Sequence, residues 1–182
     1  MKKFLAILLS STMIVSSAIA GQFYNRNSGQ WTVAGYTAEG SLNPTCMAST
    51  RWPNGAAMRL IHDLKDGELY ILYENPYLNI MDKPGSVFNL RVVFDNSVAL
   101  MGEYEVISVN AFRIRNISHE VFLPKFSAAS VMDFIMPGNM PNIRAGLTGT
   151  RNSMLLMAEC INLSRNYTSG PHAPASKPGI TL

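Results

Sequence analysis

Two histidines in the body of the chain, His62 and His119, are the side chains best suited to acid–base chemistry near neutral pH. Nucleophilic catalysis also needs a nucleophile and a group that orients the histidine base. Each histidine is followed by an acidic residue, but neighbouring side chains of an extended strand point to opposite faces. The chain has no G-x-S-x-G sequence. We therefore expect strand or turn histidines, and an unrecognised hydrolase stays as an alternative.

A second chemical candidate is the pair of carboxylates at Glu103 and Glu105, which would share one face of an extended segment. Two carboxyl groups on one face can hydrolyse glycosidic bonds. The pair follows Gly102, at an expected strand start or hairpin tip. That position is typical of a solvated sheet edge, so we expect no catalytic role for either residue.

The chain is rich in methionine, with 11 residues, and exported copper carriers use methionine as a soft ligand. Two pairs near the end of the chain are spaced as on one face of a helix, namely Met132 with Met136 and Met154 with Met157. Methionine also fills irregular gaps in hydrophobic cores, and this role explains the spacing. We expect neither a metal nor another cofactor.

The aromatic residues between positions 52 and 77 are the remaining candidates for a binding site. Trp52, Tyr70, Tyr73 and Tyr77 lie in and beside an expected hairpin and the loop that follows it. Exposed tyrosine and tryptophan are typical of binding surfaces. Tyr70 and Tyr73 differ by an odd step, so one should face the core and the other should be exposed. We predict that these aromatics form the contact surface, with cross-strand packing as the alternative.

The chain has two cysteines, Cys46 and Cys160. In an exported protein an even number of cysteines indicates a disulfide. A redox or zinc site would require closely spaced cysteines, and the two lie more than 100 residues apart. We therefore predict a single structural disulfide between an early strand and the last regular element.

The first 20 residues, MKKFLAILLSSTMIVSSAIA, have the pattern of a cleavable signal peptide. Two lysines precede a short apolar stretch, and small residues occupy the end. The apolar stretch is shorter than the roughly 20 residues that span a bilayer. Gly21 follows the expected cut, where a lipoprotein would have cysteine. We therefore expect a soluble periplasmic or secreted protein with no membrane span after cleavage.

Cleavage also changes the charge of the chain. The first 20 residues contain two lysines and no acidic residue, so the formal net charge falls from +3 to +1. Nucleic-acid binding is usually accompanied by a clustered basic face. A nearly neutral domain gives no support for that function.

Alternating apolar residues, separated by turn residues, predict a run of strands in the first two thirds of the domain. The expected strands are residues 30–36, 45–52, 56–64, 68–73, 87–94, 98–101, 105–115 and 117–123. Asp66-Gly67 marks a hairpin turn. Residues 75–85 form a loop with two prolines.

After residue 124 the apolar spacing becomes helical. A helix is expected over residues 125–136, then a short strand over 143–147 and a final helix over 151–165, with Thr150 as its N-cap. Apolar positions 154, 155, 158 and 161 would line the buried side of this last helix.

The predicted fold class is α+β: an antiparallel β-sandwich or a curved, barrel-like sheet covered by two C-terminal helices. The predicted organisation is a signal peptide (1–20), an N-terminal lead (21–28), one globular domain (29–166) and a disordered tail rich in proline and glycine (167–182).

Several short segments occur in the order seen in one family of bacterial proteins. They are Trp31-Thr32-Val33, Cys46-Met47-Ala48-Ser49, a Phe94-Asp95-Asn96 turn, Leu147-Thr148-Gly149-Thr150 and a terminal helix with Ala158-Glu159-Cys160. In this order they resemble the invasion-associated locus B family of exported proteins over residues 29–163. The chain has Asn96 where the family tends to have glycine, and Thr150 where serine is usual.

The resemblance implies a periplasmic or surface location, sometimes with a link to host-cell invasion, and it supplies no catalytic residues. We therefore expect an exported, non-enzymatic binding protein whose partner is a protein or a cell-envelope component. One alternative is a periplasmic or secreted inhibitor of a hydrolase, which would insert the loop of residues 75–85 into a cleft.

Overall fold

The computed structural model describes residues 21–37, 43–116, 118–138 and 140–169. Within these residues the chain forms ten strands and two helices. They are β1 (Gly21–Ser28), β2 (Trp31–Thr37), β3 (Pro44–Arg51), β4 (Ala57–Asp63), β5 (Leu69–Glu74), β6 (Val87–Phe94), β7 (Val98–Ser108), β8 (Ala111–Arg115), α1 (His119–Ala128), β9 (Val131–Ile135), β10 (Ile143–Gly146) and α2 (Thr150–Ser169). The predicted signal peptide and residues 170–182 of the predicted tail lie outside the described residues.

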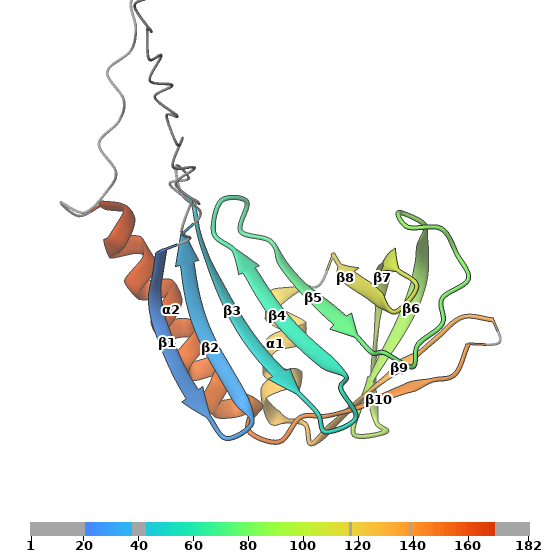
Figure 1. The fold of residues 1–182 in the computed structure, drawn as a ribbon. Coiled ribbons are helices and arrows are strands. Elements are labelled where there is room, and N and C mark those ends of the chain that lie inside the picture. Colours follow the sequence, from blue (N-terminus) through green and yellow to red (C-terminus); the bar gives the residue numbers. More distant parts are fainter. Residues whose placement is uncertain (1–20, 38–42, 117, 139, 170–182) are drawn as a thin grey trace, which may run out of the picture.

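All ten strands belong to one antiparallel sheet in the order β1-β2-β3-β4-β5-β8-β7-β6-β9-β10. Figure 1 shows that this sheet is curved and that both helices lie on one side of it. The two ends of the order, β1 and β10, do not pair, so the sheet is not closed. The predicted α+β class is confirmed, in its form of a curved sheet with two helices.

Burial alternates along the strands, as the period-two pattern predicts. Every second residue of β3 and of β5 is buried. The side chains that face the helices form one core cluster that continues from β2 across the sheet to β10. Trp31 is fully buried in it, and its indole nitrogen donates a hydrogen bond to the carbonyl of Thr148, 3.0 Å away. Its ring meets Phe126 of α1 edge to face, so one residue joins β2 to α1 and to the turn before α2.

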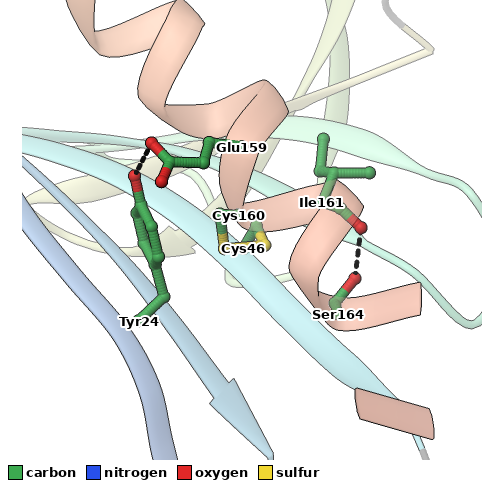
Figure 2. Close-up of a disulfide and its surroundings, with 6 residues drawn as sticks. All are labelled: Tyr24, Cys46, Glu159, Cys160, Ile161 and Ser164. Atoms are coloured by element: carbon green, nitrogen blue, oxygen red, sulfur yellow. Dashed lines mark hydrogen bonds between the residues drawn. A yellow bond between two sulfur atoms is a disulfide. The ribbon is translucent and has the colours of Figure 1, made fainter. Parts of the chain in front are cut away.

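The disulfide between Cys46 of β3 and Cys160 of α2 confirms the predicted pairing. Both residues are fully buried, and α2 packs on β1, β2 and β3 around them. Figure 2 shows a second link beside the disulfide, where the Tyr24 hydroxyl of β1 donates to the Glu159 carboxylate, 2.9 Å away. These contacts fix α2 against one end of the sheet.

The buried side of α2 differs from the predicted one. Its buried residues are Thr150, Ser153, Met157, Cys160 and Ser164. Three of these are small polar residues. The hydroxyl of Ser164 donates a hydrogen bond to the carbonyl of Ile161 (Figure 2). The helix lies so close to the sheet that small side chains fit there, whereas the larger apolar Leu155 is exposed.

The segment from 117 to 136 also differs from its prediction, which placed a strand first and a helix second. The helix comes first, as α1, and its buried residues Phe122 and Phe126 are four positions apart. A strand, β9, then follows. The Asp95 carboxylate accepts hydrogen bonds from the amides of Ser130 and Val131, and this fixes the point where the helix has ended and β9 begins.

Two further boundaries were not predicted. Residues 21–28, expected as a lead into the domain, form β1 at the edge of the sheet. Residues 105–115, expected as one strand, contain a turn at Val109 and Asn110 that separates β7 from β8.

Candidate functional site

The structure separates the four aromatic residues predicted to bind a partner. Tyr70 and Tyr73 point to opposite faces of β5, as their odd spacing predicts. Tyr73 is the core member and packs against Trp52, which is half-buried, with ring centroids 6.3 Å apart. Tyr70 lies on the outer face under the guanidinium of Arg113, 5.6 Å from its ring centre. Tyr77 is the most exposed of the four, at 81 %.

Tyr77 belongs to a loop whose side chains alternate between core and solvent. Leu78 and Ile80 are buried, the latter to 3 % exposure. The residues on either side of this pair point outward, and Met81 is 86 % exposed. Two buried anchors therefore hold Tyr77 and Met81 out in solvent at fixed positions.

Hydrogen bonds tie the same loop to the turn between β7 and β8. The amide of Ile80 donates to the carbonyl of Val109 over 2.7 Å, and the amide of Asn75 donates to the carbonyl of Asn110 over 2.9 Å. The Asn75 side-chain oxygen in turn accepts from the amide of Tyr77. Figure 1 shows the loop leaving β5 and following a long path along the outside of the molecule before it enters β6.

The end of β7 and the turn each contribute one exposed apolar side chain, Ile107 and Val109 respectively. We call Tyr77, Met81, Ile107 and Val109 the apolar loop surface. Isolated exposed apolar residues are ordinary, but several on two segments bonded to each other are typical of an interaction site.

A hollow of about 420 Å³ lies between the start of the loop and this turn. Ile107 lines it, together with Pro76 next to Tyr77. Arg51 and Glu74 line its polar side, and the Glu74 carboxylate accepts from Arg59 over 2.7 Å. An apolar centre with a polar, charged rim is the usual composition of a protein–protein interface.

His62 and His119 contact each other. Their rings are 5.4 Å apart, edge to face, and His62 is half-buried on β4. Burial, and secondarily the charge of His119, lowers the pKa of His62. The Asp63 carboxylate accepts from the amide of Lys65. This arrangement keeps His62 neutral at physiological pH and positions no nucleophile within the described contacts.

The two candidate carboxylates hold β7 against β8. Glu105 is half-buried and pairs with Arg113 at 2.8 Å and with Arg115 at 3.0 Å. Glu103 accepts from the side-chain amide of Asn116 over 2.9 Å. Both carboxylates thus have defined structural partners on the outer face of the sheet.

The methionines predicted to fill the core do so. Met132, Met136 and Met157 are buried, and Met154 is half-buried against the core cluster. Within the part of the chain that the structure describes, no group of three or more histidine, cysteine or acidic residues could hold a metal ion. None of the helices in that part is long and apolar enough to cross a membrane.

Tyr77 is the one member of the apolar loop surface that the sequence predicts; Met81, Ile107 and Val109 were not predicted. The alternation of residues 77–81 could have indicated Met81, because every second side chain there is apolar and buried. The shared exposure of Ile107 and Val109 could not be predicted, because the alternation of residues 105–115 fits one continuous strand. The backbone hydrogen bonds of Asn75 and Ile80 to the turn show that this part of the hairpin lies beside the loop.

Neither a family model nor a curated protein matches this sequence. Among solved structures the chain is similar to invasion associated protein B from Bartonella henselae, with a TM-score of 0.54 and 14 % sequence identity. The match covers 79 % of this chain and 98 % of that chain. At this identity the likeness concerns the fold alone. It confirms, at the level of the fold, the resemblance indicated by the order of the short sequence segments.

Proposed function

We propose that this chain is an exported, non-enzymatic protein that binds a protein or cell-envelope component through the apolar loop surface. The observation that carries the proposal is the exposure of Tyr77 and Met81 on a loop anchored by Leu78 and Ile80. A loop fixed in this way loses little conformational freedom when a partner binds, and this favours affinity.

The composition of the surface favours a protein as the partner. Tyrosine and methionine are enriched in protein interfaces, and the best-buried aromatic anchors carry most of the binding energy. The adjacent hollow is lined by Ile107 and Pro76 and could receive a side chain of the partner.

The disulfide supports the export part of the proposal. Disulfides form and persist in oxidising compartments and are rare in the cytosol. The buried pair Cys46–Cys160 is compatible with the signal-like first 20 residues. Fractionation of the producing cell, with N-terminal sequencing of the product, tests this part. We expect a periplasmic or secreted protein that begins at Gly21.

The binding part is tested with the oxidised mature chain as an immobilised bait. The double variant Tyr77→Ser, Met81→Ser should lose partners that the wild type retains. Leu155→Ser is the matched control, because Leu155 is also a large apolar residue, 68 % exposed, but lies on α2. Equal recovery of the same partner by all three proteins would rule out the apolar loop surface.

A second candidate function, inhibition of a hydrolase, is favoured by the same rigid loop. An inhibitor inserts an ordered, exposed segment into a cleft and changes shape little on binding. Assays of hydrolases from the same compartment or from a host, with and without the chain, distinguish the two functions. Inhibition that disappears in the Tyr77→Ser, Met81→Ser variant would identify an inhibitor.

A further inference from the structure

A cavity of about 220 Å³ opens between α1 and the strands β6, β7 and β8. It shares no lining residue with the apolar loop surface. Its apolar lining comes from the sheet and from the helix, with Val92, Leu100, Ile114, Val121 and Phe122. Helix α2 packs on β1, β2, β3 and α1, whereas this cavity lies over a different part of the same face of the sheet.

Gly102 keeps the cavity open. It lies inside β7 opposite Leu90, whose side chain faces the core. A Cβ atom at this position would lie 3.4 Å from the Cγ2 of Ile114, an ordinary contact, so crowding does not require glycine there. Glycine inside a strand weakens the strand and often marks a place where a ligand approaches the backbone. The missing side chain leaves space that is part of the cavity.

One end of the cavity is polar. Asn116 and Ser118 line it where the chain enters α1. Ser118 occupies the N-cap position, and its side chain makes no capping hydrogen bond. Its hydroxyl group therefore remains able to bind a ligand, whereas its carbonyl already accepts from the amide of Phe122.

We propose that this cavity binds a single medium-length alkyl chain with a small polar head, such as a medium-chain fatty acid. The volume exceeds the roughly 150 Å³ apolar cavity that accommodates benzene. It is below the roughly 300 Å³ at which drug-sized sites begin, so a helix or strand of a partner does not fit. The lining crosses three adjacent strands, which are about 4.8 Å apart, and a length of about 10 Å suits a chain better than a ring. The head would lie at the Ser118 hydroxyl, because the side-chain amide of Asn116 already donates to the Glu103 carboxylate.

The test is a titration of the oxidised mature chain with sodium octanoate below its micelle concentration, followed by NMR of the methyl groups. We expect saturable shifts of the methyl groups of Leu100, Ile114 and Val121. Gly102→Leu should fill the cavity and weaken binding at least about tenfold, since a filled cavity loses the apolar contacts of the chain. Its melting temperature should equal or exceed that of the wild type.

A second variant, Val121→Asn, addresses the same cavity from a half-exposed helix position and serves if Gly102→Leu does not fold. It should also weaken binding, whereas Leu155→Asn on α2 should leave the affinity unchanged. The proposal is overturned if octanoate causes no saturable shifts, or if the shifts are confined to the apolar loop surface. Unchanged affinity in both cavity variants, or binding to phospholipid vesicles without binding of monomeric octanoate, would overturn it as well.

Discussion

The imidazole rings of His62 and His119 meet edge to face where β4 approaches the first residue of α1, with their centroids 5.4 Å apart. Burial is the main cause that lowers the pKa of His62, and His119 and Arg165 act in the same direction, whereas Asp63 opposes them. The Nδ1 atom of His62 is buried and has no hydrogen-bond partner among the described residues. Protonation of His62 is therefore unfavourable in the folded state.

The first prediction is a loss of stability on acidification. The unfolded chain keeps the ordinary histidine pKa of about 6.5 and binds a proton first as the pH falls. The contribution of neutral His62 to the free energy of unfolding is therefore fully present above about pH 6.5 and is lost progressively below it. Denaturant titrations at about pH 7.5 and about pH 5.5 should show a smaller free energy of unfolding at the lower pH.

A variant assigns this effect to the histidine. His62→Gln cannot titrate in this range, so its free energy of unfolding should change less between the two pH values. Glu120→Gln, in the first turn of α1, is the matched control and should keep the full decrease. If the free energy of unfolding of His62→Gln decreases between the two pH values as much as that of the wild type, His62 is not the cause of the acid sensitivity.

The second prediction concerns the disulfide, whose cysteines are 114 residues apart. Closing a loop of this length restricts the unfolded chain, and the chain-entropy model gives about 4–5 kcal/mol as an upper value. The double variant Cys46→Ala, Cys160→Ala should lose stability of this order in denaturant titrations. Intact mass after alkylation gives an independent check, because two alkylated thiols in the untreated protein would contradict the bond.

The third prediction concerns Gly35, which lies on β2 beneath the disulfide. A Cβ atom there would overlap the ring of Phe23 and lie 2.9 Å from the Sγ of Cys160. Gly35→Ala should therefore destabilise the fold by about 1–3 kcal/mol, because both the Phe23 ring and the disulfide sulfur must shift. Gly146→Ala in β10 is the control, since its new methyl group would come no closer than 3.9 Å to Trp52. Equal stability of the two variants would show that α2 is not held this close to β2.

The strands could be predicted from the sequence because the burial pattern and the turn residues agree. The turn at Asp95 and Asn96 is an example, since both residues have positive φ, and aspartate and asparagine tolerate this region better than most residues. The prediction for residues 117–136 was wrong because the apolar pattern is ambiguous. Met132, Phe134 and Met136 have the spacing of a strand, and Met132 and Met136 also have the spacing of a helix. The strand forms because Asp95 binds the amide of Ser130, 35 residues later in the chain, and because β9 pairs with β6.

The site was less predictable than the fold. Cys46 and Cys160 could be paired because there was no third cysteine. The buried and the exposed aromatic residues could not be distinguished in the same way. Trp52 packs against Tyr73 at the edge of the core only because the loop after β3 lies beside strand β5. Exposure of a side chain depends on the complete fold, and this information is absent from local patterns.

The last prediction separates the anchors of the loop from its contact residues. Leu78→Ala removes a buried side chain and should cost about 2–5 kcal/mol of folding stability. Tyr77→Ala removes an exposed one and should change stability by less than about 0.5 kcal/mol. Because the buried side chain of Leu78 anchors the loop in the core cluster, Leu78→Ala should also make residues 75–85 accessible to a protease. Limited proteolysis with mass spectrometry should then find cleavage in this loop in Leu78→Ala but not in Tyr77→Ala. Equal cleavage in the wild type would mean that the loop is not fixed and would contradict a preformed binding surface.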